Sequence, residues 1–237
     1  MPLPKIATPS YELTLPSNGK KVKYRPFLVK EEKILIMALE SDDLKQIGNA
    51  IKDVLSACII TRGVKVDTLS TFDIEYLFLN VRGKSVGESI DLLVTCEDDG
   101  ETKVSATIAI DDIKVVTSAE HERDIKLDDE LTLRMRYPSL NEFISQNFGT
   151  GDRLDQSFEV IAGSVEMIFS QEESWEAKDY SKKEWVQFIE QLNSSQFKKI
   201  ERFFETMPKL SHTLTVINPN TGKENSIVLE GLASFFS

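Results

Sequence analysis

Two stretches of this 237-residue chain show the same order of features, which indicates a tandem repeat. The alternating, strand-like residues 21–25 meet a proline and run directly into a helical pattern, and residues 132–136 do the same. Each half closes on a second hairpin whose turn has the form x-x-x-x-Gly, at residues 96–100 and 218–222. We therefore predict an α+β fold of two related halves, each a small helical cluster with flanking β-hairpins.

The predicted boundary between the repeats lies near Ser118. Residues 1–117 form the first α+β repeat, with an N-terminal hairpin, helices and a knuckle-like hairpin. Residues 118–237 form the second repeat, with an extra helix and a C-terminal hairpin. A chain of this length is long enough for two small cores of about 115 residues each.

Apolar residues at helical spacing predict the helices. The clearest helix has an inward stripe of Leu44, Ile47, Ile51, Val54, Leu55 and Cys58. Its expected counterpart in the second half is a helix marked by Phe158, Ile161, Val165, Ile168 and Phe169. A short helix over residues 140–147 precedes that counterpart, and two more helices follow it before Pro208.

The charge balance limits the partners that the chain can have. There are 28 Lys and Arg residues against 39 Asp and Glu residues, a formal net charge of −11, which argues against wrapping nucleic acid. No apolar run approaches the roughly 20 residues of a membrane span, and the first residues lack the apolar region of a signal peptide. We expect a cytoplasmic protein without nucleic-acid, membrane or small-molecule partners.

Catalytic motifs are incomplete wherever the sequence approaches one. Residues 83–85 read Gly-Lys-Ser, but Phe78 stands where a phosphate-binding loop needs its first glycine. Residues 87–91 lack the second glycine of a nucleophile elbow. The chain has two histidines, His121 in the joint between the halves and His212 at the start of a strand. We predict no enzyme activity, no catalytic residues and no cofactor.

The two glycine-closed turns have the shape of zinc knuckles without the ligands. A zinc knuckle aims two thiolates at one ion from a tight turn. In the first turn Asp99 stands where the second cysteine after Cys96 would be, and the second turn has Asn218 and Thr221 at the two matching positions. One thiolate does not make a zinc site, so we expect no bound metal and hairpins held by turn chemistry and packing.

Four stretches together resemble a known family: residues 24–33, residues 81–88, the two knuckle-like turns, and the ending at residues 229–236. In this combination the chain resembles the baseplate proteins of T4-type contractile-tailed bacteriophages, specifically the hub subunit or hub assembly protein. Some relatives carry cysteine pairs in the two turns, and this chain departs from that pattern at Asp99, Asn218 and Thr221.

The resemblance implies a virion or assembly component without catalytic residues. Its partners would be other tail and baseplate hub proteins, and it would be made in the host cytoplasm and act at the tail baseplate. One alternative is a transient chaperone of hub assembly that is absent from the mature virion. An alternative of another class is a hub-associated hydrolase.

Aromatic residues are the candidates for partner contact. Trp175 stands in an acidic stretch, and Phe235 and Phe236 lie at the end of the chain. Tryptophan is enriched where partners bind, although anchoring a loop or filling the core is the alternative for each of the three. Exposed edge strands of the hairpins are further candidates, because their unpaired backbone groups can accept another strand.

Overall fold

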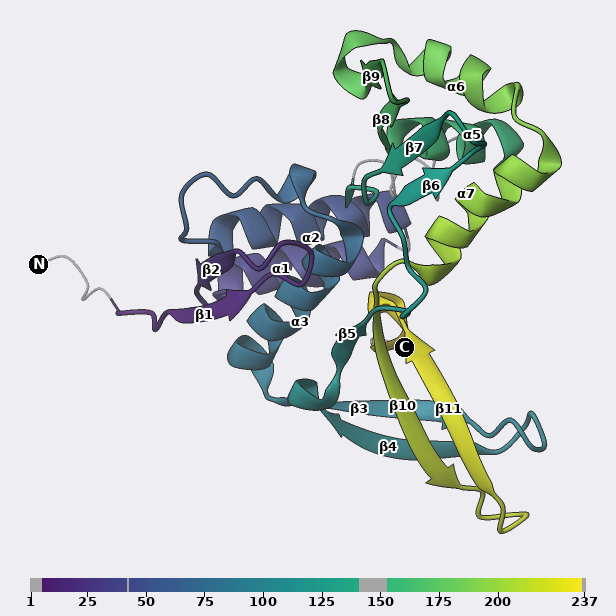
Figure 1. Cartoon of the computed structure of the whole chain (residues 1–237). Coiled ribbons are helices and arrows are strands. Elements are labelled where there is room, and N and C mark those ends of the chain that lie inside the picture. Colours follow the sequence, from purple (N-terminus) through teal and green to yellow (C-terminus); the bar gives the residue numbers. More distant parts are fainter. Residues whose placement is uncertain (1–5, 42, 141–152, 236–237) are drawn as a thin grey trace, which may run out of the picture. The chain divides into compact units, whose positions relative to one another are not determined.

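The computed structural model describes residues 6–41, 43–140 and 153–235, and it combines α-helices with small antiparallel sheets (Figure 1). The predicted α+β class is therefore confirmed. The chain divides into two compact units. Unit 1 contains Met1–Val66, Phe72–Val116 and Lys209–Ser237, and unit 2 contains Asp67–Thr71 and Thr117–Pro208.

The first part of unit 1 is a hairpin followed by helices. In chain order its elements are β1 (Tyr11–Thr14), β2 (Lys21–Tyr24), α1 (Val29–Glu40), α2 (Leu44–Cys58) and α3 (Thr71–Val86). The stripe predicted for α2 faces inward at its C-terminal end, where Val54, Leu55 and Cys58 are fully buried. A buried carboxylate on α3, Asp73, accepts a hydrogen bond from the backbone N–H of Ser17 in the β1–β2 turn at 3.0 Å and thereby joins the hairpin to the helix.

The second part of unit 1 consists of two hairpins and a short strand. These elements are β3 (Ser89–Thr95), β4 (Lys103–Ala109), β5 (Lys114–Val116), β10 (Lys209–Ile217) and β11 (Glu224–Glu230). β3 pairs with β4, and β10 lies between β11 and β5 in a second sheet. The inward residues of both sheets share one apolar core with the buried Phe235. The two hairpins are therefore packed against each other, which brings their distant turns together.

Unit 2 is a four-stranded antiparallel sheet with helices. Its elements are β6 (Asp124–Lys126), β7 (Thr132–Met135), α5 (Arg153–Gly163), β8 (Val165–Phe169), β9 (Ser174–Glu176), α6 (Lys182–Glu190) and α7 (Ser194–Thr206). The strand order is β6-β7-β8-β9, so β6 and β9 are the edges. Capping boxes start α6 at Ser181 and α7 at Asn193, where the side chains satisfy N–H groups that the helix leaves unpaired.

The structure corrects one predicted helix. Apolar residues from Phe158 to Phe169 were expected to form a single helix, but α5 ends at Gly163 and residues 165–169 form β8. The backbone N–H of Ser164 still bonds back to Val160, after which Val165 and its neighbours pair with β7. β-branched residues favour the extended chain once a partner strand is present. The short helix predicted over residues 140–147 lies almost wholly outside the described residues.

The C-terminal hairpin lies in unit 1 with the first half, because β10 pairs with β5. The boundary near Ser118 and the tandem origin of the two repeats stay predictions. One local arrangement does recur. The backbone N–H of Arg25, after β2, bonds to the carbonyl of Cys58 at 3.0 Å, and that of Arg136, after β7, bonds to the carbonyl of Ser164 at 2.8 Å. In each case a chain leaving a hairpin is tied to the end of a helix.

Candidate functional site

The two knuckle-like turns meet at one end of unit 1. The buried side-chain amide of Asn218 donates hydrogen bonds to Asp98 at 2.8 Å and to Asp99 at 2.9 Å. The Thr221 hydroxyl donates to the second carboxylate oxygen of Asp98 at 2.5 Å. The side chain of Asn225 accepts the backbone N–H of Asp98 at 2.9 Å. The predicted positions thus come together, and polar side chains link them.

Both turns close on a glycine with the same hydrogen bond and a similar φ angle. The N–H of Gly100 bonds to the carbonyl of Cys96 at 3.0 Å, and the N–H of Gly222 bonds to that of Asn218 at 2.8 Å. The two glycines have φ angles of 69° and 72°, a left-handed conformation that side chains disfavour. The shared glycine closure is local, since the loop between the paired strands spans residues 96–102 in the first turn and residues 218–223 in the second.

The residues at these positions do not fit a zinc ion. Burial, and then the charges of Asp98 and Asp99, raises the pKa of the Cys96 thiol, which disfavours the thiolate that zinc needs. The Asn218 amide and the Thr221 hydroxyl direct donor hydrogens at the two carboxylates, so they act as hydrogen-bond donors instead of ligands. Across the described part of the chain, no three His, Cys, Asp or Glu side chains are grouped to hold a metal.

The same hydrogen bonds stabilise the ionised carboxylates. The Thr221 hydroxyl and then the Asn218 amide lower the pKa of Asp98. The side chain and backbone of Thr102, and then Asn218, hold the pKa of Asp99 well below its usual range. Five neutral groups donate to these two adjacent carboxylates: the Asn218 amide, the Thr221 and Thr102 hydroxyls, and the backbone N–H groups of Glu101 and Thr102. The first two come from the other hairpin, which makes the junction a polar clamp between the hairpins. We call the side chains of Asp98, Asp99, Asn218 and Thr221 the turn clamp.

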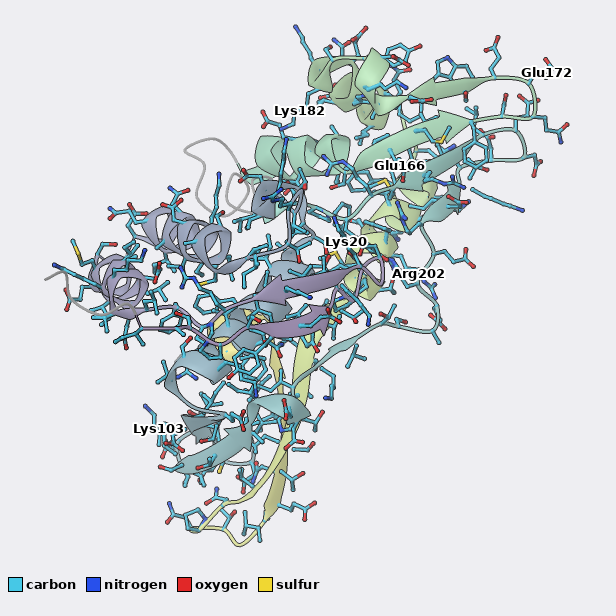
Figure 2. All side chains as sticks on the ribbon, turned by 90° about the vertical axis from the view of Figure 1, so that its left-hand side faces the viewer. Lys20, Lys103, Glu166, Glu172, Lys182 and Arg202 are labelled. Carbon is cyan, nitrogen blue, oxygen red and sulfur yellow. The ribbon has the colours of Figure 1, made fainter. Side chains whose placement is uncertain are left out.

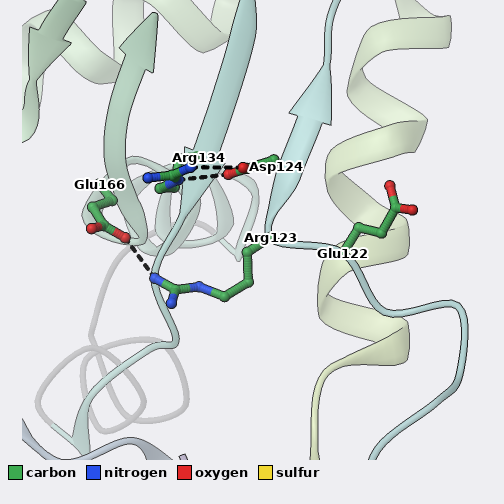
Figure 3. A pocket seen from close by; sticks show the side chains of 5 residues that line it. All are labelled: Glu122, Arg123, Asp124, Arg134 and Glu166. Carbon is green, nitrogen blue, oxygen red and sulfur yellow. Dashed lines mark hydrogen bonds and ion pairs between the residues drawn. The ribbon is translucent and has the colours of Figure 1, made fainter. Parts of the chain in front are cut away.

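A charged pocket of about 410 Å³ lies on unit 2 (Figure 3). The Arg134 guanidinium donates two hydrogen bonds to the Asp124 carboxylate, at 2.6 and 2.7 Å, and the Arg123 guanidinium donates to Glu166 at 2.5 Å. Glu122 completes the lining. Because each guanidinium already faces a carboxylate, the pocket offers no spare positive charge for an anionic ligand. It is best explained as an ion-paired surface that fixes the β6 and β7 strands.

A second, apolar groove of about 290 Å³ lies between the sheet of unit 2 and α6. Most of its lining is aromatic or aliphatic, and Glu184 is its one charged member. The lining residues are Leu131, Ile168, Trp175, Tyr180, Glu184, Trp185 and Phe188. Both tryptophans of the chain line this groove.

The predicted partner-contact residues have different positions. Trp175 is half-buried on β9 and lines the apolar groove. Phe235 is fully buried in the core of unit 1, so it anchors the end of the described chain. Phe236 lies outside the described residues. Tyr180, Trp185 and Phe188 belong to the groove as well.

The incomplete catalytic motifs have structural roles. Gly83 lies inside α3, where a Cβ atom would come within 2.9 Å of Ile110, so glycine permits close packing there. The Ser85 hydroxyl donates to the carbonyl of Val81 at 2.6 Å and accepts the backbone N–H of Phe27 at 2.9 Å. Residues 83–85 therefore join a helix to its neighbours and form no phosphate loop.

The histidines are also used in packing. His121 lies against the rings of Tyr137 and Phe203, and its ring nitrogens lie 3.1 Å from the Thr206 hydroxyl and 3.2 Å from the Tyr137 hydroxyl. Burial, with the charge of Arg123, lowers the pKa of His121, which favours the neutral ring. His121 therefore anchors the joint to the core of unit 2.

Comparison with known families places the chain. The family described as T4 bacteriophage base plate protein matches residues 8–237, and the chain belongs to this family. It is therefore a phage baseplate protein, located in the virion tail baseplate and associated with other baseplate proteins, as its sequence resemblance predicted. No curated protein and no solved structure matches the chain. No helix of the described residues has the length and apolar character to cross a membrane.

Proposed function

We propose that this chain is a non-catalytic structural or assembly component of the central hub of the baseplate, and that it acts through protein-protein contacts. The observation that carries the proposal is the family match over residues 8–237. The hub position rests on the resemblance of residues 24–33 and 229–236 to hub proteins. The chain would be made in the host cytoplasm and join the tail there.

The surroundings of the reactive side chains support a role without catalysis. The ring nitrogens of His121 face hydroxyl groups within the core of unit 2, and the Nδ1 atom of His212 lies 3.3 Å from the carbonyl of Asp112. Cys58 is fully buried, and burial raises the pKa of its thiol to about 11. A nucleophile needs an exposed position and a base beside it, and these groups are placed for packing instead.

The predicted tandem repeat suggests how the chain could engage its partners. If the two halves are copies of one ancestral unit, similar surfaces on one chain can engage neighbouring subunits of the hub. Two contacts carried by a single chain lose less association entropy than two separate modules would. The recurrent tie after each first hairpin, at Arg25 and at Arg136, favours this reading.

Mass spectrometry of purified tails tests the proposal. A structural hub component should be present in a fixed ratio to the other baseplate proteins. Absence from mature tails, with presence in assembly intermediates, would instead identify a transient chaperone. A hydrolytic activity of the purified chain on host cell-wall material would contradict the non-catalytic role.

A further inference from the structure

The apolar groove lies beside an open sheet edge. β9 pairs with β8 on one side, and no strand of the described residues pairs with its other side. The backbone N–H of Ser170 bonds to the carbonyl of Glu173 at 2.8 Å, so Glu173 turns its carbonyl toward the β8 side. This bond determines which residues of β9 turn their backbone groups toward β8 and which turn them away. Ser174 and Glu176 therefore direct their N–H and C=O groups outward, and Trp175 directs its own toward β8. The edge thus offers two donors and two acceptors to another strand.

The groove lies on the face that an added strand would reach. Trp175 lies opposite Ile168, and both side chains line the groove. A residue opposite Trp175 on a strand added to β9 would point to the same face, because directly paired residues share a face. Its side chain would enter the space between Trp175, Trp185 and Tyr180. Tyr180 is 41% exposed there, so the groove can be reached from solvent.

The surroundings of the groove are acidic. Residues 171–184 contain five acidic and three basic residues, a net charge of −2. Two of the three lysines already pair with carboxylates, Lys178 with Glu176 and Lys182 with Glu159. Glu172 and Glu173 are exposed in the β8–β9 turn, and Figure 2 shows Glu172 at the outer end of that hairpin. A strand beside β9 would therefore meet the negative charge of Glu172 and Glu173 on one side of its central residue and the Glu176–Lys178 ion pair on the other.

We propose that the edge of β9 and the apolar groove together bind an extended segment of another baseplate protein. That segment carries a large apolar side chain, with Lys or Arg residues on the side that faces the β8–β9 turn. The apolar side chain fills the groove, the backbone extends the sheet, and the basic residues face Glu172 and Glu173 in that turn. The proposal rests on the proposed function, because it takes the partner to be a baseplate protein.

Charge distinguishes this occupant from a second copy of the chain. The whole chain has a net charge of −11, so two copies repel each other. A basic segment gains from the same charges, which raise its rate of association and weaken as salt is added. Aromatic side chains at the centre of a contact contribute much of its binding energy. The groove provides four of them, including both tryptophans.

Co-purification from paired expression tests the proposal. The full chain is co-expressed with each of the other baseplate proteins of the same phage in turn, and the complexes are isolated by affinity. Overlapping peptides that cover each bound partner are then titrated against the purified chain, with tryptophan emission as the signal. Because both tryptophans line the groove, occupation of the groove should change this emission.

Three variants separate the contributions. Ser174→Pro removes an outward N–H and spares the pairing with β8, so it should weaken binding at least tenfold, whereas Ser174→Ala keeps the N–H and should bind normally. Tyr180→Ala opens the groove and should also weaken binding. Glu172→Lys with Glu173→Lys should weaken binding and reduce its salt dependence. Glu97→Lys with Glu101→Lys makes the same charge change on unit 1 and serves as its matched control.

Each result decides between the two proposals. Binding of a peptide with a large apolar residue and neighbouring basic residues, lost on Ser174→Pro and kept on Ser174→Ala, supports the groove. If the chain binds baseplate proteins and the three groove variants bind equally well, the groove proposal is wrong and the proposed function stands. If the chain binds no other baseplate protein, the proposed function is wrong, and the groove proposal, which depends on it, is wrong as well. A wild-type dimer that Ser174→Pro converts to monomers would identify a self-contact and overturn the proposed occupant.

Discussion

Removing the Asn218 side chain should separate the two hairpins of unit 1. This amide is fully buried and donates to both Asp98 and Asp99. Its oxygen accepts the backbone N–H groups of Asn220 at 2.8 Å and Thr221 at 3.3 Å. The Asn218→Ala substitution therefore deletes four hydrogen bonds, and of the turn clamp only the Thr221 hydroxyl still donates to a carboxylate of the other turn.

The magnitude follows from the partners. A hydrogen bond contributes about 1 kcal/mol net, and one to a charged group about 1.5 to 3 kcal/mol. The carboxylates of the clamp can regain water when the amide is removed, so the lower values apply. We expect Asn218→Ala to lower the free energy of unfolding by about 2 to 4 kcal/mol. For a chain of this size, that corresponds to a fall in Tm of about 5 to 12 °C.

Urea denaturation at pH 7, followed by far-UV circular dichroism, measures this change. Asn220→Ala is the matched control, because Asn220 has the same side chain in the same turn but is exposed, and its side chain makes one bond between the turns, to the Thr102 hydroxyl at 2.9 Å. It should cost less than about 1 kcal/mol. Asn218→Asp should be worse than Asn218→Ala, since it places a third carboxylate against Asp98 and Asp99. Equal stability of the two alanine variants would refute the role of the turn clamp.

Three further predictions concern pH, a buried ion pair and helix packing. The pKa values of Asp98 and Asp99 are lower in the folded chain than the ordinary value of 3.8, so their stabilising contribution is present above about pH 4 and is lost as the pH falls. Urea midpoints measured between pH 5 and pH 2 should therefore fall more steeply for the wild type than for Asn218→Ala. Parallel curves for the two proteins would contradict this. Glu31 is 3% exposed and bonds to Arg25 at 3.0 Å, so Glu31→Gln should cost about 2 kcal/mol in thermal or urea unfolding, and a neutral effect would contradict the pairing. Gly83→Ala brings a methyl group against Ile110. In a double-mutant cycle with Ile110→Val, the double variant should therefore lose less free energy of unfolding than the sum of the two single variants. Strictly additive losses would contradict the contact.

The local sequence pattern correctly predicted elements whose conformation is determined by their own residues. The two glycine-closed hairpins around Gly100 and Gly222 occur where the turns predicted them, because glycine supplies the left-handed conformation that closes the turn. The helix of residues 71–86 also follows its apolar spacing, with Ile74, Leu77 and Val81 buried.

Elements that depend on a distant partner were not predictable in the same way. Residues 165–169 have apolar spacing that suits a helix, and only pairing with β7 makes them a strand. The strand β9 has three residues in an acidic stretch, which is too short for an alternating pattern to appear. The pairing of β10 with β5 joins residues about a hundred positions apart, and no local signal records it.

The candidate sites show the same division. The four knuckle positions were found from turn spacing alone. Three of them, Asp99, Asn218 and Thr221, meet in the turn clamp, and this depends on two hairpins packed across a shared core that contains the fourth, Cys96. Trp175 was singled out for its residue type and its acidic surroundings. The groove around it combines side chains from strands and from α6, so the sequence alone could not assemble it.

The most direct test of the account is a cryo-electron microscopy map of the assembled baseplate. The account predicts density for this chain at the central hub, in contact with other baseplate proteins, with a strand of one neighbour beside β9 and an apolar side chain of that strand in the groove. A map that places the chain away from the hub, or that lacks it altogether, would contradict the account.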